Sequence, residues 1–352
     1  MTKEDSQTPA PSQMPLEVGK LPPHQWLMLI SAAKWVAQPV HALAKLDVAD
    51  HLAQEELSTR ELAERLGVAA NPLRRCLRAA SSVGIFRETA PERWGLTDAA
   101  QPLRTDAPIS LRDFTVLLGE APMWEPFGRI MDVLHGDGPA FETTHQRSMY
   151  ELLAAEPELN RVYQGAWAPL TAGVMHALTK SYDFTPYSSV ADLGGGQGTA
   201  LRILLQANPH LTGVLMDLPH TLQACSTDHG DVGDRITHYP GRLPEDVPPD
   251  IDLYLLKNTL HCLSPDLVSR TLERLREEIR HPRQRLIIVE AVVQPGNGFD
   301  WSKLMDVEVM VNNGGREHTL EEWRTSLAQC GFRLTAADEV LHPQWILEAA
   351  PA

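Results

Sequence analysis

An acidic strand end that runs directly into glycines places the strongest constraint on the fold of this chain. Residues 190–193 (Val-Ala-Asp-Leu) predict a buried strand, a glycine-rich turn follows, and a helix is expected from Thr199. Glycines let the backbone turn sharply and let a ligand approach without interference from a Cβ atom. A second apolar segment ends at Asp217, 23 residues after Gly194, where a carboxylate can accept both hydroxyls of a ribose. Together these features predict a site for a nucleoside-bearing cofactor.

The spacing of the glycines favours S-adenosylmethionine over a dinucleotide. The turn reads G-x-G-x-G over 194–198, whereas dinucleotide sites favour G-x-G-x-x-G. Asp192 also precedes the first glycine by two positions. S-adenosylmethionine has no pyrophosphate to bind, and a carboxylate near its ammonium group is favourable. A dinucleotide site and a plain strand-turn-helix without a ligand are the alternatives.

Length and charge set outer limits on the protein class. A chain of 352 residues suits two domains, and a hydrophobic fraction of 43% is ordinary for a globular protein. The net charge of −15 disfavours nucleic acid and anionic membrane surfaces, and no apolar run is long enough to cross a membrane. The four cysteines form no C-x-x-C pair, so we expect reduced thiols, no metal site and a cytoplasmic location.

The N-terminal third predicts a winged helix. Residues 1–22 are rich in Pro, Ser, Thr and Gln and are expected to be a disordered tail. Helices are predicted over 26–52, 58–67 and 71–80, and two wing strands over 85–88 and 93–97. Such a module either dimerises the chain or binds DNA, and Arg74, Arg75 and Arg78 on one helix would suit DNA. The acidic chain and the cofactor site favour the dimerisation module of an enzyme.

Strands and helices alternate after the glycine turn. Further strands are expected over 235–239, 251–257 and 285–290, a helix over 266–280, and a closing antiparallel pair over 332–335 and 344–348. This alternation predicts an α/β fold with a mostly parallel sheet covered on both faces. The expected domains are a dimerisation domain over 23–110, a helical linker that contributes to a substrate pocket over 111–180, and a cofactor-binding domain over 181–352.

Several motifs resemble those of the S-adenosylmethionine-dependent small-molecule O-methyltransferases of the plant caffeate and bacterial natural-product type. They are Tyr-Asp-Phe at 182–184, Gly-Pro-Ala-Phe-Glu at 138–142, residues 252–261 ending at His261, and Gly-Gly-Arg-Glu-His-Thr at 314–319. The resemblance covers about residues 25–349. It implies a seven-stranded Rossmann-like methyltransferase domain behind a winged-helix dimerisation domain, and therefore a homodimer.

The resemblance also assigns roles to individual residues. His261 corresponds to the general base of the family, and Glu290 and Glu317 correspond to two carboxylates that flank and orient it. The implied cofactor-binding residues are Asp192, Gly194, Gly195, Gly196, Asp217, Leu218, Arg242, Leu243 and Lys257. Three departures affect adenine contacts and pocket shape: Arg242 replaces an acidic residue, Cys262-Leu263 replace Asp-Trp, and Trp167 replaces a common methionine.

The substrate is predicted only by class. The expected pocket residues are Trp124, Phe127, Trp167, Met175, Met305, Glu308 and Asn312. A carboxylate and an amide in an otherwise apolar pocket suit a nitrogen heterocycle or a polyhydroxylated aromatic, unless Glu308 faces solvent. We therefore expect O-methylation of an aromatic or heteroaromatic small molecule in bacterial secondary metabolism, such as antibiotic biosynthesis. An N- or C-methyltransferase, a non-methylating S-adenosylmethionine-binding enzyme and a DNA-binding regulator are the alternatives.

Overall fold

The computed structural model describes residues 21–225 and 230–352. Residues 1–20 of the predicted tail therefore lie outside the described residues. The chain separates into two compact units, one ending at Gly119 and the other running from Glu120 to Ala352. In the described ranges, no helix is both long and apolar enough to cross a membrane.

The first unit contains the predicted helices and wing. Its helices are α1 (Pro23–Ser31), α2 (Lys34–Lys45), α3 (Val48–Gln54), α4 (Thr59–Leu66), α5 (Ala70–Ser81), η2 (Asp98–Leu103) and α6 (Arg112–Gly119). Ser58 begins α4 with a capping box, in which its side chain accepts the Glu61 N–H and Glu61 accepts the Ser58 N–H. Leu43, Leu62 and Leu77 are fully buried and form part of the core of this unit.

The first wing strand is shifted by two residues from the predicted 85–88, and the second ends at Gly95 rather than at residue 97. β1 (Leu57–Ser58), β2 (Arg87–Ala90) and β3 (Arg93–Gly95) form an antiparallel sheet in the order β1-β3-β2. The expected strand over 85–88 begins only at Arg87 because Phe86 has a positive φ of 67° and is buried. A left-handed residue turns the chain and cannot continue an extended strand.

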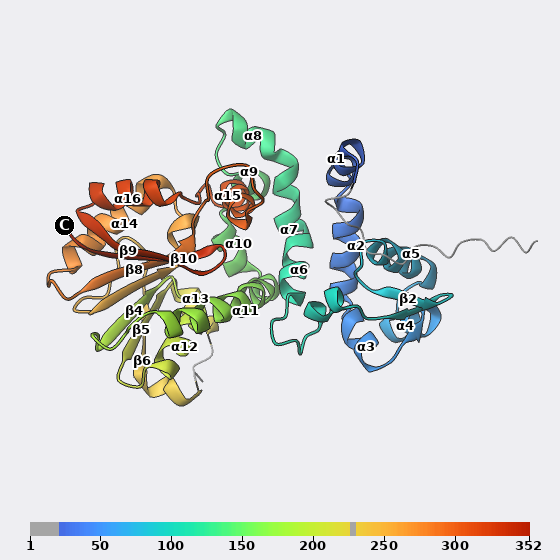
Figure 1. Ribbon diagram of the computed structural model, residues 1–352, viewed down its shortest axis with the longest axis horizontal. Coiled ribbons are helices and arrows are strands. Elements are labelled where there is room, and N and C mark those ends of the chain that lie inside the picture. Colours follow the sequence, from blue (N-terminus) through green and yellow to red (C-terminus); the bar gives the residue numbers. More distant parts are fainter. Residues whose placement is uncertain (1–20, 226–229) are drawn as a thin grey trace, which may run out of the picture. The chain divides into compact units, whose positions relative to one another are not determined.

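Helices also fill the beginning of the second unit. They are α7 (Ala121–Trp124), η3 (Glu125–Arg129), α8 (Ile130–His135), α9 (Ala140–His145), α10 (Met149–Ala155) and α11 (Pro157–Ser181). A capping box at Ser148 begins α10. The 25-residue α11 then extends toward the large sheet, and its first strand follows in the chain (Figure 1).

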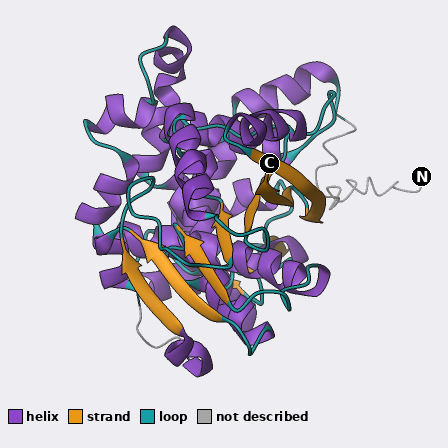
Figure 2. Cartoon of the chain, turned by 90° about the vertical axis from the view of Figure 1, so that its left-hand side faces the viewer, coloured by secondary structure: helices purple, strands orange, loops and turns teal. Residues whose placement is uncertain are grey.

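A seven-stranded sheet forms the centre of the second unit, with helices on both of its faces (Figures 1 and 2). The strands are β4 (Ser189–Leu193), β5 (Thr212–Asp217), β6 (Ile236–Pro240), β7 (Leu253–Lys257), β8 (Arg285–Ala291), β9 (Phe332–Leu341) and β10 (Gln344–Pro351). Their order is β6-β5-β4-β7-β8-β10-β9. Strands β4 to β8 pair in parallel, whereas β10 pairs antiparallel with both β8 and β9. The predicted α/β fold class is therefore confirmed.

Two apolar clusters cover the two faces of this sheet. One contains Leu204 of α12 (Thr199–Ala207) and Leu215 of β5; the other contains Leu272 of α14 (Pro265–Glu278) and Trp323 of α16 (Leu320–Gln329). The strand order reverses between β4 and β7, because the chain runs from β4 outward to β6 and then returns to the other side of β4. Open α/β sheets bind ligands at such a reversal, beside the carboxyl ends of the strands.

Candidate active site

The glycine turn after β4 forms a tight cradle beside the end of β5. Gly194 has a φ of 74°, and a Cβ on it would lie 2.7 Å from the Thr259 side chain. A Cβ on Gly195 would lie 2.6 Å from Oδ2 of Asp192. The Gly196 N–H donates to Asp217 Oδ2 at 2.8 Å. Glycine is therefore required here for close approach as well as for conformation.

Asp192 and Lys257 place opposite charges on adjacent strands beneath this cradle. Burial raises the pKa of Asp192 to about 7, an effect that the Lys257 ammonium opposes. Burial likewise lowers the pKa of Lys257 to about 8, against the attraction of Asp192 and Glu290. Asp192 Oδ2 is buried and has no hydrogen-bond partner within the described parts of the chain. The ammonium group of S-adenosylmethionine is the kind of donor that such an oxygen lacks, so the residues fit this cofactor.

The ends of β5 and β6 lie side by side next to the cradle. Asp217 accepts the Leu218 N–H at 2.7 Å, and burial raises the pKa of its carboxyl. The Asp217 carbonyl accepts the Gly241 N–H at 3.0 Å, which holds the following turn beside it. Leu243 packs against the core, whereas the Arg242 side chain is exposed and the Arg242 backbone N–H donates to Asp246.

His261 lies just beyond the carboxyl end of β7, in the short helix η5 (Leu260–Cys262). Its side chain is buried, and Nδ1 lies 2.7 Å from Oε1 of Glu317. Because an ionised carboxylate only accepts hydrogen bonds, Nδ1 carries a proton and Nε2 of the neutral ring is left as the acceptor. This tautomer is the one required of a base that works through Nε2.

Glu290 and Glu317 contact different parts of His261. Glu317 contacts the ring, whereas Glu290 Oε1 accepts the backbone N–H groups of His261 at 3.1 Å and Thr259 at 3.2 Å. Glu290 ends the buried strand β8 and is 0% exposed. Glu290 therefore fixes the loop that carries the histidine and leaves the ring orientation to Glu317.

Burial and neighbouring charges shift the pKa values of His261 and Glu290 in opposite directions. Burial alone lowers the pKa of His261, but contacts with Cys262 and Glu317 outweigh it and raise the pKa well above the ordinary value. Burial raises the pKa of Glu290 to about 7, with His261 opposing the shift. The histidine is thus a stronger base than a free imidazole.

The Gly-Gly-Arg-Glu loop closes directly over the histidine backbone. The His261 carbonyl accepts the Arg316 N–H at 3.0 Å, and a Cβ on Gly315 would overlap that carbonyl oxygen. The Glu317 N–H donates to Asp306 Oδ1 at 2.8 Å, in the helix α15 (Trp301–Asn312). Glu317 is therefore held by its backbone as well as by the histidine ring.

Two tyrosines outside the predicted site residues lie close to Cys262. Burial raises the pKa of Tyr150 of α10, and the neighbouring Cys262 and the Tyr163 hydroxyl of α11 raise it further. Cys262 also raises the pKa of the adjacent His261 ring. Burial raises the pKa of Tyr163, and the charges of Cys262, Asp217 and Glu308 also act on it. Tyr163 is therefore within electrostatic range of groups on η5, β5 and α15. In the sequence, Tyr163 has no signal of a functional residue beyond its position in a predicted helix.

The predicted pocket residues occupy four kinds of position. Glu308, Met305 and Asn312 lie on α15, where Asn312 Nδ2 donates to Glu308 Oε1 at 2.7 Å. The Trp167 ring meets Tyr163 edge-on at 6.2 Å between ring centres. Met175 is fully buried in the apolar cluster that contains Leu204 and Leu215. Trp124 and Phe127 are 36% and 39% exposed and lie in α7 and η3.

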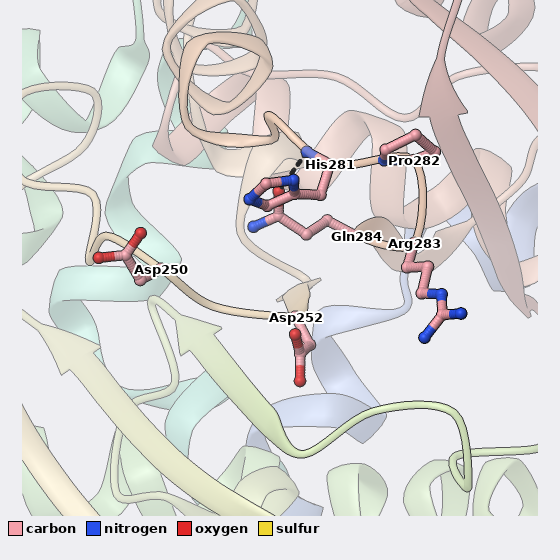
Figure 3. A pocket seen from close by; sticks show the side chains of 6 residues that line it. All are labelled: Asp250, Asp252, His281, Pro282, Arg283 and Gln284. Carbon is pink, nitrogen blue, oxygen red and sulfur yellow. Dashed lines mark hydrogen bonds between the residues drawn. The ribbon is translucent and has the colours of Figure 1, made fainter.

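A separate hollow lies at the opposite edge of the sheet (Figure 3). Its lining residues stand at or before the starts of β7 and β8; they are Asp250, Asp252, His281, Pro282, Arg283 and Gln284. Asp252 accepts the Ser188 N–H at 2.7 Å, and Gln284 donates to the Ile251 carbonyl at 2.7 Å. These polar groups fix strand starts, at the edge away from His261.

Comparisons with known proteins agree with this geometry. An O-methyltransferase domain matches residues 127–333, and an O-methyltransferase dimerisation domain matches residues 29–106. A phenazine O-methyltransferase of Lysobacter antibioticus is 34% identical over 340 residues, which cover 95% of this chain and 98% of that protein.

Solved structures share the whole architecture. The crystal structure of LaPhzM superposes with a TM-score of 0.88 at 32% identity and covers 94% of this chain and 100% of that one. CalO1, a methyltransferase in calicheamicin biosynthesis solved with S-adenosylhomocysteine bound, has a TM-score of 0.80 at 28% identity over 95% of this chain and 100% of that one. The chain therefore belongs to the family of S-adenosylmethionine-dependent O-methyltransferases, with a dimerisation domain ahead of the O-methyltransferase domain.

Proposed function

We propose that this enzyme methylates a hydroxyl group on an aromatic or heteroaromatic small molecule of bacterial secondary metabolism, with His261 as general base. The observation that carries the proposal is the buried His261–Glu317 pair, 2.7 Å apart, at the carboxyl edge of the sheet. The cofactor cradle and the Tyr163 hydroxyl adjoin the same edge. These observations support a site in which His261 serves as the base, Asp217 holds the nucleoside and the tyrosines form an aromatic wall.

The proton transfer follows from the tautomer of His261. When bound, S-adenosylmethionine supplies an electrophilic methyl group. The acceptor hydroxyl gives its proton to Nε2, and its oxygen forms a bond to the methyl carbon as the bond between that carbon and the sulfonium sulfur breaks. The sulfur keeps the electron pair, so S-adenosylhomocysteine is the leaving group. The imidazolium that results is stabilised by Glu317 at Nδ1, and it releases the proton after the product leaves. Positioning contributes much of the rate because two bound molecules react within one site.

The four carboxyl groups of the site have separate roles in this proposal. Glu317 orients the ring and raises its basicity, whereas Glu290 holds the Thr259–His261 backbone in place. Asp217 binds the ribose, and Asp192 accepts the ammonium group. Tyr150 and Tyr163 come from the helical segment 111–180, which would then supply one wall of the pocket.

The substrate class is supported by the walls of this space. Tyr150, Tyr163 and Trp167 are aromatic, and flat apolar rings suit an aromatic acceptor. A phenol-like hydroxyl is also more acidic than an aliphatic alcohol, so a histidine can deprotonate it. The phenazine O-methyltransferase noted above acts on a fused aromatic of this kind. We extend that class, a hydroxylated phenazine, to this chain.

The test is turnover of His261→Ala with a panel of hydroxylated aromatics and phenazines, with products identified by mass spectrometry. We expect turnover to fall about 10²–10⁴-fold, the usual contribution of positioned proton transfer. Affinity for S-adenosylmethionine should change little. Activity that survives well below the pKa of the acceptor would rule out His261 as the base and favour methyl transfer to nitrogen or carbon.

A further inference from the structure

A carboxyl and an amide lie one helical turn apart on α15 and share a single hydrogen bond. Asn312 Nδ2 donates to Glu308 Oε1 at 2.7 Å. The Asn312 side chain is only 2% exposed, yet its Oδ1 has no hydrogen-bond partner in the described ranges 21–225 and 230–352. A buried acceptor without a hydrogen bond is unfavourable, because it has lost its contact with water and gained no partner in return. The unpaired Oδ1 of Asn312 indicates that a hydrogen-bond donor of a ligand belongs at this point.

The pair lies on the helix that contacts Glu317, the carboxylate partner of His261. The charge of Glu308 acts on the Tyr163 hydroxyl, which is also reached by Cys262, the neighbour of the base, and by Asp217 of the cofactor cradle. The same helix holds Glu317, because Asp306 Oδ1 accepts the Glu317 N–H at 2.8 Å. The pair is therefore built on the element that also positions the carboxylate partner of His261.

Charge adds to the argument for a polar ligand. Burial raises the pKa of Glu308 to about 7, and the hydrogen bond from Asn312 only partly opposes this shift. A donor that reaches the remaining oxygens would satisfy both the ionised carboxylate and the amide carbonyl. An apolar ring edge would leave both oxygens unpaired and would bind less well.

We propose that Glu308 and Asn312 form the specificity-determining element of this enzyme, and that they accept a second N–H or O–H donor on the acceptor ring. That donor stands apart from the hydroxyl that is methylated. The inference rests on the proposed function, since it takes this space to be the acceptor site. The preferred substrate is then an aromatic compound that carries a second hydrogen-bond donor, such as a dihydroxylated heterocycle or one with a ring N–H.

The experiment compares a monohydroxyphenazine with the corresponding dihydroxyphenazine as acceptors. The wild-type enzyme should prefer the dihydroxy compound in kcat/KM by roughly 10–100-fold, the effect of a hydrogen bond to a charged or buried polar group. Glu308→Met should reduce this preference to about threefold or less, chiefly through KM. Glu308→Gln keeps an acceptor oxygen and should restore part of the preference.

Controls separate recognition from a structural effect. Glu321→Gln changes an exposed carboxylate on α16 and should keep the wild-type preference. Calorimetric affinity for S-adenosylhomocysteine should be the same in all variants. If Glu308→Met binds S-adenosylhomocysteine normally and keeps the wild-type preference, the proposal is wrong. If the wild type methylates neither phenazine nor any other hydroxylated aromatic, the proposed function itself fails and this inference fails with it.

Discussion

At the scale of single residues, the site depends on two buried carboxyl groups that have different hydrogen-bond partners. Glu317 contacts a ring nitrogen, whereas Glu290 accepts two backbone N–H groups. Both are almost completely buried, at 2% and 0% exposure. A buried carboxylate is costly unless hydrogen bonds or charge offset its loss of water. Each glutamate therefore holds its own partner in one arrangement, and substitutions at the two positions should fail in different ways.

Glu317→Gln should shift the pH dependence of the reaction. Glu317 helps to raise the pKa of His261, so a neutral amide at this position should lower that pKa. The free histidine must be deprotonated to act, so rates fall as the pH drops below its pKa. The acid limb of the kcat/KM profile should therefore move to lower pH in the variant, while the maximum rate falls. A profile with an unchanged acid limb would show that Glu317 does not act through His261.

Glu290→Gln is the comparison for that experiment. It keeps an oxygen that can accept the backbone N–H groups of Thr259 and His261, and Glu290 does not touch the ring. Its acid limb should move less than that of Glu317→Gln. An equal or larger shift in Glu290→Gln would contradict the separate roles assigned here.

Asp217→Ala should weaken binding of S-adenosylmethionine by roughly 1.5–3 kcal/mol, the range for hydrogen bonds to a charged group. Asp217 ends β5 and holds the Gly196 and Leu218 N–H groups, so the variant also loosens the glycine turn. Isothermal titration calorimetry measures the affinity. Asp183→Ala removes an exposed carboxylate that binds its own local turn and provides the control. Equal affinities in the two folded variants would refute the ribose assignment.

At the scale of elements, the sequence patterns predicted what depends on local and periodic signals. Buried apolar runs such as 285–290 and the capped helix at Ser58 appear where they were expected. The strand predicted over 251–257 begins only at Leu253, and the wing strand begins late because Phe86 is left-handed. The period of apolar residues does not mark either boundary. At the wing strand, the left-handed conformation of a single residue, Phe86, decides where the strand begins.

The parts of the site that depend on distant contacts were less predictable. Tyr150 and Tyr163 read as ordinary helical residues, and only the packing of α10 and α11 brings their hydroxyls to Cys262. The resemblance placed both glutamates beside His261 but did not separate a ring contact from a backbone contact. Met175 has the composition of a pocket residue, yet its helix face packs it into the core. Such outcomes depend on which face of a helix meets the sheet.

Thr319→Ala tests how far a helix cap supports the site. The Thr319 side chain accepts the Glu322 N–H, and Glu322 accepts the Thr319 N–H, which forms a capping box at the start of α16. Loss of this cap should destabilise the protein by about 1 kcal/mol. Because Thr319 follows Glu317 by two residues, kcat should also fall modestly. Chemical denaturation and steady-state kinetics measure the two effects. Thr325→Ala in the middle of α16 is the control and should change neither strongly.

At the scale of the whole molecule, the first unit exposes more apolar surface than a monomer normally does. Leu27, Met28 and Trp35 are 67%, 67% and 70% exposed, and no residue of α1 is buried. Large exposed apolar patches mark interaction sites. The O-methyltransferase dimerisation domain matches residues 29–106, which supports a homodimer. We propose that the apolar stripe from Trp26 to Val40 is buried between the two subunits.

This proposal predicts a change of mass on a charge substitution. The wild type should have twice the 39.0 kDa chain mass by light scattering at micromolar concentration. The double variant Leu27→Glu/Trp35→Glu should be monomeric, because two carboxylates cannot be buried in an apolar interface without a large desolvation cost. Gln54→Glu adds a negative charge at an exposed position of α3 outside the stripe and should stay dimeric. A double variant that remains dimeric, or a fully active wild-type monomer, would place the subunit interface elsewhere.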